Sequence, residues 1–281
     1  MAQFSGSSHG AGLPVEHIDI RGLNIAYRRA GEGAPLVLLH GGPTNGREWR
    51  NQLEGLSDAF TVVAWDMPGT GGSDDPPDHF APRDYADCLA EFIGRLGLRH
   101  PHVLGLSFGS GLALELYRWH PEIPRSLVLA SAYAGWAGSL PPEAVAQRKA
   151  AMARMIDLPP DAWAHEWLPT LLTQAASADV VDELSAVLAE FHPAGQRALL
   201  ESGWTEHDVR DVLPHIKVPT LLLYGDRDLR SPAAVAEAMH AQIPGSQLVF
   251  MPGVGHMGHL EMPDRFNAEV RHFLGSVRAS T

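Results

Sequence analysis

Short uninterrupted apolar runs recur along the chain and set its expected architecture. They span residues 35–40, 60–65, 102–104, 125–132, 220–225 and 247–251. Apolar runs of this length without alternation are typical of strands that are covered on both faces of a sheet. Helical patterns lie between or after them, over residues 84–96, 110–117, 232–243 and 263–278. This succession of strands and helices predicts a parallel α/β sheet from about residue 35 onward.

The first two predicted strands have a different pattern, because apolar and polar positions alternate in them. Residues 15–20 and 23–29 are expected to pair as an antiparallel hairpin that turns at Arg21-Gly22. Residues 1–14 precede the hairpin, are rich in glycine and serine at their start, and contain no apolar core segment. They are predicted to be a mobile N-terminal segment that is neither a signal peptide nor an anchor.

The strand–helix succession stops between residues 133 and 204. This stretch holds Leu-, Ala- and Glu-rich helical patterns broken by prolines, and it predicts an inserted cap of three or four helices. The core is then expected to comprise residues 15–132 and 205–281. The large aromatic residues of the cap are Trp136, Trp163, Trp167, Phe191 and Trp204. These side chains either line an apolar pocket or pack the core of the cap, and for each one taken singly we favour packing.

Length and composition indicate a protein with a sizeable core. A chain of 281 residues suits one large domain or a domain with an insertion, and 45% hydrophobic residues can fill that core. The formal net charge of −12 argues against nucleic acid or an anionic membrane as a partner, and we interpret it as favouring solubility. The partner expected from the candidate chemistry described below is a small-molecule substrate, and a homo-oligomer is left open.

The single cysteine excludes an intrachain disulfide. Cys88 lies in a predicted amphipathic helix, where we expect a buried small hydrophobe and not a nucleophile. Such cysteine usage fits a cytoplasmic location. No apolar stretch is long enough to span a membrane, and neither CxxC nor HExxH spacing is present, so no metal or cofactor is predicted.

A five-residue turn carries the most specific chemical signal in the chain. Gly105–Gly109 has the form G-x-S-x-G, follows an apolar strand and precedes a helix, which is the nucleophile-elbow pattern. A serine in such a turn projects its hydroxyl above the edge of the sheet, and the flanking glycines leave room for neighbouring chain segments. Ser107 is therefore the candidate nucleophile, and the N–H of Phe108 is a candidate oxyanion donor at the start of the helix.

Two glycine-containing loops follow strands near this turn. Gly41 and Gly42 come directly after the apolar run 35–40, where the loop either offers a bare N–H as a second oxyanion donor or is a simple strand-to-helix turn, which we favour on this segment alone. His40 is expected to fix this loop by hydrogen bonds. Residues 66–74 contain several glycines but lack phosphate-binding spacing, so they are predicted to form a structured crossover loop.

An acid and a base are predicted at the ends of later strands. Asp228 and His256 each follow an apolar run, and the carboxyl ends of parallel strands meet at one edge of the sheet. A serine needs an imidazole to accept its proton, and the imidazole needs a carboxylate to orient it. Asp226 and His259 are the alternatives, for which we favour a loop-capping role and a pocket-wall or supporting role, respectively.

Taken together, these segments resemble the α/β-hydrolase superfamily over nearly the whole chain. The residues that carry the resemblance are His40-Gly41-Gly42-Pro43, Asp66-Met67-Pro68-Gly69-Thr70-Gly71-Gly72-Ser73, Gly105-Leu106-Ser107-Phe108-Gly109, Gly225-Asp226-Arg227-Asp228, and Gly255-His256 followed by Glu261-Met262-Pro263. The resemblance implies an eight-stranded, mostly parallel sheet with helices on both faces and a helical cap after strand six. It also implies Ser107 as nucleophile, Asp228 as acid and His256 as base, with oxyanion donors at Gly42 and Phe108.

The expected function is hydrolysis of a small or medium apolar carboxylic ester or lactone through an acyl-enzyme. The alternatives are an aminopeptidase similar to proline iminopeptidases, a carbon–carbon bond hydrolase with the same triad, and a non-catalytic ligand receptor. Thr44 and Met67-Pro68 depart from the iminopeptidase pattern, and a serine nucleophile disfavours the dehalogenase and epoxide hydrolase branches. An aminopeptidase requires acidic residues that bind the substrate ammonium group. The cap offers Glu166, Asp182, Glu183, Glu190 and Glu201.

Overall fold

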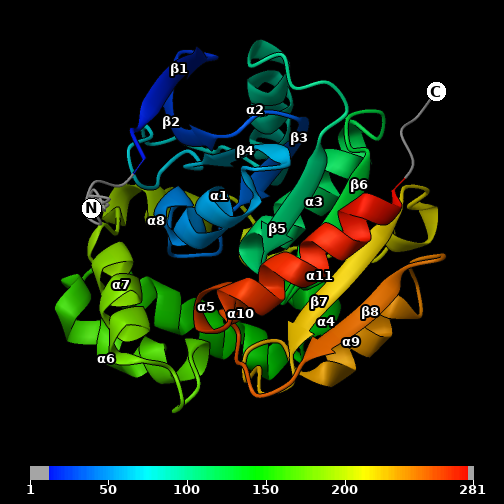
Figure 1. Ribbon diagram of the computed structural model, residues 1–281. Helices are drawn as coiled ribbons and strands as arrows, with labels where there is room; N and C mark the ends of the chain where they lie inside the picture. The colour runs from blue at the N-terminus through cyan, green and yellow to red at the C-terminus, as the bar shows by residue number, and fades with distance from the viewer. Residues whose placement is uncertain (1–12, 278–281) are drawn as a thin grey trace, which may run out of the picture.

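Eight strands form one sheet in the computed structural model, which describes residues 13–277 (Figure 1). They are β1 (Glu16–Ile20), β2 (Leu23–Ala30), β3 (Ala34–Leu39), β4 (Phe60–Trp65), β5 (His102–Leu106), β6 (Ser126–Ala130), β7 (Thr220–Gly225) and β8 (Gln247–Met251). The strand order is β1-β2-β4-β3-β5-β6-β7-β8. The predicted eight-stranded sheet is confirmed. Of the predicted mobile segment, residues 1–12 lie outside the described residues.

The sheet is antiparallel only at its N-terminal edge. β1 pairs with β2 around the Arg21-Gly22 turn, with Ile20 opposite Leu23, and β2 pairs in turn with β4 in antiparallel register. β3 to β8 pair in parallel, from Leu36 opposite Val62 to Gly225 opposite Met251. The predicted hairpin and the predicted parallel sheet are both confirmed.

Each central strand supplies side chains to two separate hydrophobic cores, because successive residues of a strand point to opposite faces. In β3, Val37 and Leu39 pack against α2 (Pro82–Arg95), α3 (Phe108–Trp119) and α9 (Ala233–His240). Leu36 and Leu38 pack on the other face, against α1 (Arg50–Leu56) and α11 (Pro263–Ser276). This double coverage explains why the parallel strands are apolar throughout.

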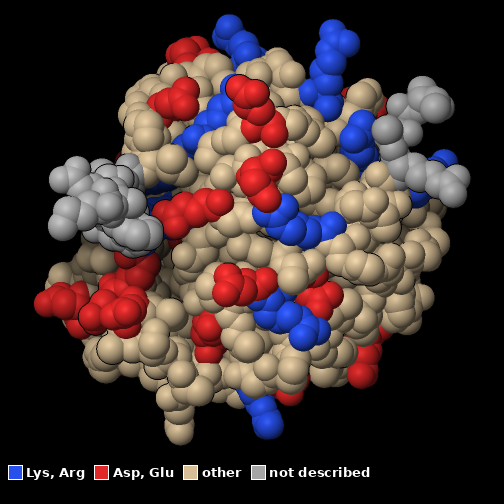
Figure 2. All heavy atoms as spheres, in the orientation of Figure 1, with Lys and Arg blue, Asp and Glu red and all other residues tan. Residues whose placement is uncertain are grey.

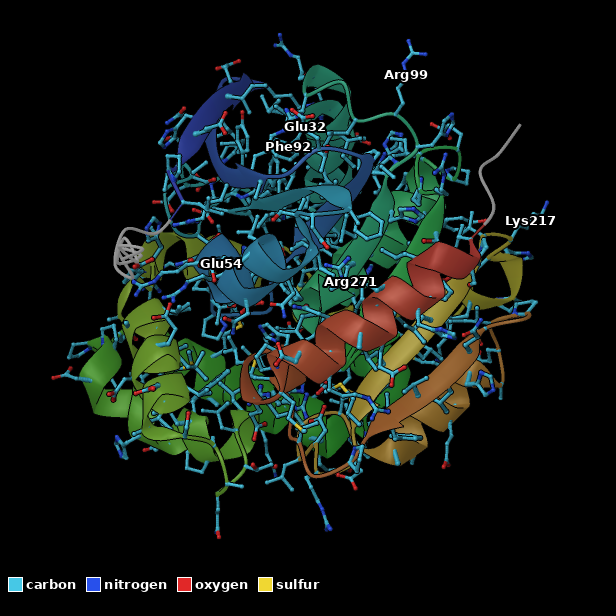
Figure 3. All side chains as sticks on the ribbon, in the orientation of Figure 1. Glu32, Glu54, Phe92, Arg99, Lys217 and Arg271 are labelled. Atoms are coloured by element: carbon cyan, nitrogen blue, oxygen red, sulfur yellow. The ribbon has the colours of Figure 1, made fainter. Side chains whose placement is uncertain are left out.

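Two helices that the sequence did not predict complete the second face. α1 has seven residues and α10 (Gly258–Glu261) has four, so neither gives a clear helical period. Arg271 on α11 donates hydrogen bonds to the Gly55 carbonyl oxygen and to the Asp58 carboxylate at the end of α1 (Figure 3). These contacts join two helices that are more than two hundred residues apart in the chain.

Five helices lie between β6 and β7. They are α4 (Trp136–Ser139), α5 (Pro142–Ile156), α6 (Pro160–Leu171), α7 (Ala178–Ala189) and α8 (Pro193–Glu201). Prolines open α5, α6 and α8, where a missing N–H costs nothing. Pro169 does not end a helix, contrary to expectation, because α6 continues through it to Leu171. Figure 1 shows α5–α8 gathered beyond the carboxyl ends of β5–β7.

Acidic side chains are concentrated over part of this helical segment. Figure 2 shows them gathered where α6 and α7 lie in Figure 1, while both signs of charge are mixed over the rest of the visible face. Within residues 13–277, no helix is long and apolar enough to cross a membrane.

Candidate active site

Ser107 occupies a strained turn between β5 and α3. Its backbone has φ of 51° and ψ of −110°, a conformation that costs energy for any residue with a side chain. Its N–H donates to the Ala130 carbonyl oxygen at 2.8 Å, which fixes the turn to the end of β6. A strained serine held by a neighbouring strand fits the predicted elbow.

Both glycines of the elbow are required by close backbone contacts. A Cβ added to Gly109 lies 2.2 Å from the Leu39 carbonyl oxygen, on the adjacent β3. A Cβ added to Gly105 lies 2.3 Å from the Gly109 carbonyl oxygen. The G-x-S-x-G spacing therefore allows α3 to begin directly against the end of β3.

Asp228 and His256 meet beyond the ends of β7 and β8. His256 Nδ1 lies 3.0 Å and 2.9 Å from the two carboxylate oxygens of Asp228, and both side chains are buried. Asp228 Oδ1 also accepts the N–H groups of Arg230 and Ser231, at 2.8 and 2.9 Å. Burial opposes ionisation of Asp228, but His256 and these N–H groups outweigh it and hold the pKa of the carboxyl below its usual 3.8.

The two loops that carry this pair are packed tightly together. A Cβ added to Gly225 lies 2.2 Å from the Val254 carbonyl oxygen, so only glycine permits this approach. Ser131 Oγ donates to the His256 carbonyl oxygen at 3.0 Å. Glu261 accepts the N–H of Gly255 at 2.8 Å and that of Thr173 at 3.0 Å. His256 is thus held by the sheet and by the end of the α6 segment.

The loop after β3 lies beside the elbow. Gly42 and Phe108 both line the pocket that contains Ser107, and a Cβ added to Gly42 lies 3.7 Å from Phe108 Cβ. Within residues 13–277, neither the N–H of Gly42 nor that of Phe108 donates a hydrogen bond to the protein. Two unused donors at one side of a serine suit a developing negative charge.

Two buried side chains hold this loop from behind. His40 Nε2 lies 3.1 Å from the N–H of Met67 and 3.1 Å from Thr70 Oγ1, which confirms the expected loop-fixing role of His40. Glu48 accepts the N–H of Gly41 at 3.0 Å through Oε1, and its Oε2 contacts Thr44 Oγ1. Burial lowers the pKa of His40, so its imidazole is neutral in this role.

The surroundings of Glu48 favour its protonated form. Thr44 Oγ1 lies within hydrogen-bond distance of the Gly41 carbonyl oxygen, at 2.9 Å, and of Glu48 Oε2. Burial raises the pKa of Glu48 to about 7, and it outweighs the hydrogen bonds from Thr44 and Gly41.

The two alternative residues lie outside the Ser107 pocket. Asp226 Oδ1 accepts the N–H of Gly253 at 2.7 Å, which confirms its expected loop-capping role. His259 is fully buried between Trp49 and Phe266, and neither ring nitrogen has a hydrogen-bond partner among residues 13–277. Burial lowers the pKa of His259 to about 3. His259 does not line the Ser107 pocket, so the pocket-wall part of its expected role is wrong. The supporting part stays a prediction, and His259 Nε2 lies 4.0 Å from Glu48 Oε1 behind the Gly41–Gly42 loop. Cys88 is buried as expected.

An apolar pocket opens above Ser107 and is closed from the other side by the helical segment. Its wall combines the elbow and the loop after β3 with residues of the helical segment. Those residues include Trp136, Arg148, Met152, Met155, Trp167, Gln196, Leu199 and Trp204. Trp204 packs edge-on against Phe108, with ring centroids 4.7 Å apart.

The aromatic residues of this segment divide between the two predicted roles. Trp136, Trp167 and Trp204 line the pocket, and they also pack against the hydrophobic cores, so for them the two roles are combined. Trp163 and Phe191 pack together inside the segment, with ring centroids 5.2 Å apart. Helical periodicity could not separate the groups, since both sit on apolar faces.

The structure pairs Asp228 with His256 through hydrogen-bond contacts, but in the described part of the chain Ser107 has no such contact with His256. Within residues 13–277, no hydrogen bond joins Ser107 Oγ to His256. Tyr133 lines the Ser107 pocket, and its ring centroid is 6.5 Å from that of His256. Catalytic hydrogen bonds are often long until substrate binds. The described side chains contain no cluster of three or more His, Cys, Asp or Glu that suits a metal.

Three residues of this region were missed by the sequence analysis. Glu48 sits between Arg47 and Trp49 in a polar stretch, where a carboxylate is usually solvated, and it has no motif of its own. Arg148 and Arg230 line the pocket from α5 and from the loop after β7, respectively. Isolated arginines on a helix and in a loop are usually solvated, so only the fold reveals that both face Ser107.

The chain belongs to the alpha/beta hydrolase fold family, which it matches over residues 34–263. The pimeloyl-[acyl-carrier protein] methyl ester esterase of Aeromonas hydrophila is 30% identical, over 90% of this chain and 100% of its own. The proline iminopeptidase of Lactobacillus helveticus is 29% identical, over 90% of this chain and 95% of its own.

Solved structures give the same assignment. An esterase from Thermogutta terrifontis superimposes with a TM-score of 0.86 and 29% identity, covering 95% of this chain and 100% of that one. The enol-lactonase of Burkholderia xenovorans gives a TM-score of 0.82 and 25% identity, covering 93% and 100%. The superfamily resemblance in the sequence is therefore confirmed.

Proposed function

We propose that this protein is a serine hydrolase that cleaves a carboxylic ester or lactone through an acyl-enzyme. The observation that supports this most directly is the strained Ser107, which faces a pocket beside two unused N–H groups. Such a turn is costly to maintain, and strain of this kind is concentrated at functional sites. Similarity to an esterase in sequence, and to an esterase and an enol-lactonase in structure, favours the same reaction class.

In this mechanism, Ser107 Oγ attacks the substrate carbonyl carbon while its proton passes to His256 Nε2. Asp228 holds Nδ1–H and stabilises the imidazolium that forms. The N–H groups of Gly42 and Phe108 bind the oxyanion, an interaction worth roughly 3–4 kcal/mol per donor. His256 then gives the proton to the departing alcohol oxygen. Water repeats the sequence on the acyl-enzyme, which releases the acid and restores Ser107.

We further propose that residues 133–204 act as a cap over the nucleophile, with the core formed by 15–132 and 205–281. Support comes from the pocket wall, since α5, α6 and α8 each contribute residues to it. Trp167 and Leu199 present apolar surface to the acyl or alcohol part of the substrate. Remote contacts of this type contribute binding energy and exclude water from the acyl-enzyme.

The aminopeptidase alternative fits the pocket less well. Arg47 pairs with Glu183 and Glu190, and Arg154 pairs with Glu166. Among the described residues, no carboxylate lines the Ser107 pocket, whereas two arginines do. An ammonium-bearing substrate would therefore meet like charge in the pocket.

Activity measurements on matched substrates test the proposal. Wild type and Ser107→Ala are assayed against short aryl esters, lactones, a proline arylamide and a β-diketone. The expected result is ester or lactone hydrolysis by wild type and at least a 1,000-fold loss in the variant, in line with loss of a triad member. Equal ester hydrolysis by a folded Ser107→Ala protein would refute it, and turnover of the arylamide alone would favour the peptidase.

A further inference from the structure

Two arginine side chains in the Ser107 pocket have no anionic partner. Arg148 comes from α5 and Arg230 from the loop after β7, and both line the same cavity as Ser107. Among residues 13–277, no carboxylate oxygen lies within 4.0 Å of either guanidinium. Nearby arginines behave differently, since Arg154 pairs with Glu166 and Arg227 with Asp226.

Their remaining contacts position both groups without neutralising them. Arg148 donates to Tyr133 Oη at 3.0 Å and to the Arg230 carbonyl oxygen at 2.6 Å. Arg230 donates to Thr170 Oγ1 at 3.1 Å and lies over the Trp167 ring, 4.3 Å from its centroid. A guanidinium has five N–H donors, so most of the ten are unused by the protein.

The nearest acidic group compensates this charge only in part. Asp228 is two residues from Arg230, but its carboxylate is buried against His256 and accepts backbone N–H groups. Burial lowers the pKa of the Arg230 guanidinium and the charge of Arg148 adds to this effect, while Tyr133 and Asp228 oppose it without reversing it. Two like charges in a largely apolar wall are costly unless an anion joins them.

We infer that the substrate is an ester or lactone that also carries a carboxylate, which the Arg148–Arg230 pair binds while the acyl carbon lies at Ser107. This inference rests on the proposed hydrolase function and adds the substrate class to it. The planar donor forks of arginine match a carboxylate in two-point geometry. Trp167, Met152 and Leu199 then contact the aliphatic part of the molecule between its two ends.

Matched pairs of esters test the inference. Monomethyl esters of C4 to C8 dicarboxylic acids are compared with methyl esters of the monocarboxylic acids of equal carbon number. For each pair, the ratio of kcat/KM for the anionic ester to that for the neutral ester is measured. Wild type is expected to prefer the anionic ester for at least one chain length by about 10-fold or more.

Variants assign that preference to the two arginines. Arg148→Gln and Arg230→Gln are expected to lower the ratio about 10- to 100-fold, because a charge-assisted pair becomes neutral. Arg148→Lys should retain part of the preference. Arg154→Gln is the matched control on the same helix, where the side chain is half exposed and paired with Glu166, and its ratio should equal that of wild type.

The outcomes separate this inference from the proposed function. The inference is overturned if wild type turns over neutral esters at least as fast as anionic ones and the arginine variants leave the kcat/KM ratios unchanged. That result would leave the proposed hydrolase function intact. If no ester is hydrolysed, calorimetric titration of the monomethyl esters into Ser107→Ala still decides. Binding that Arg148→Gln weakens about 10-fold or more supports the inference, and absent or unchanged binding contradicts it.

Discussion

The buried Glu48 behind the Gly41–Gly42 loop gives the sharpest stability prediction. Its carboxyl is fully buried, and burial raises its pKa from the usual 4.5 to about 7. The folded protein therefore holds the proton more tightly than the unfolded chain. The contribution of this group to stability is complete below about pH 4.5 and is lost as the pH rises through about 7. By pH 8 the loss amounts to about 3 kcal/mol.

Glu48→Gln removes this penalty without removing the contacts. The amide oxygen accepts the N–H of Gly41, and the amide NH₂ faces Thr44 Oγ1. We expect the free energy of unfolding of the variant to lie within about 1 kcal/mol of that of wild type at pH 5, where the carboxyl is only partly ionised in the unfolded chain. At pH 8 the variant should be more stable than wild type by up to about 3 kcal/mol.

Urea unfolding at pH 5 and pH 8, followed by tryptophan fluorescence, measures both values. Glu54→Gln is the control on the adjacent α1, where the side chain is exposed and its pair with Arg50 contributes under about 1 kcal/mol. His259 Nε2 lies 4.0 Å from Glu48 Oε1, but burial lowers the pKa of His259 to about 3, so it is neutral at both pH values. Groups remote from residue 48 cancel in the comparison. A stability difference between Glu48→Gln and wild type that is the same at both pH values would refute the reasoning.

Three further predictions concern the elbow, the acid and the pocket wall. Gly109→Ala places Cβ 2.2 Å from the Leu39 carbonyl oxygen and should lower the free energy of unfolding by more than about 3 kcal/mol. Gly94→Ala on α2 is the control, since its Cβ meets nothing within 4 Å, and it should raise the free energy of unfolding by about 0.5–1 kcal/mol. Equal effects of the two variants in urea unfolding would contradict this. Asp228→Asn should lower kcat for a neutral ester about 10⁴-fold with little change in thermal midpoint, and a loss under 10-fold would argue against its role toward His256. Trp204→Ala should raise KM for apolar esters about 10-fold, because Trp204 covers the pocket beside Phe108, and an unchanged KM would show that substrate lies elsewhere.

The sheet could be predicted from the sequence because both of its faces are covered. β4 and β7 match their predicted runs to the residue, since an apolar run in a parallel sheet starts and stops where burial does. α1 and α10 could not be predicted from the sequence, because helices of one or two turns show no measurable hydrophobic period. The expected helix break at Pro169 was wrong for another reason. A proline is expected to interrupt a helix, but α6 continues past Pro169 to Leu171 because tertiary packing tolerates it there.

The site could be predicted only in part, for a physical reason that differs between residues. The elbow at Ser107 and the loops at Asp228 and His256 contain glycines that close backbone contacts require. Such glycines can be recognised in the local sequence. The burial of Glu48 and the orientation of Arg148 depend on segments far away in the chain, so no local pattern reveals them. The protonation of Glu48 likewise follows from burial, which only the fold creates.

The central claim is that Ser107 is an activated nucleophile, and covalent labelling tests it most directly. Wild type is incubated with a fluorophosphonate probe, digested and mapped by mass spectrometry. The account predicts one adduct, on Ser107, whose formation slows sharply in His256→Ala. No adduct on the folded protein, or an adduct on a serine other than Ser107, would contradict it.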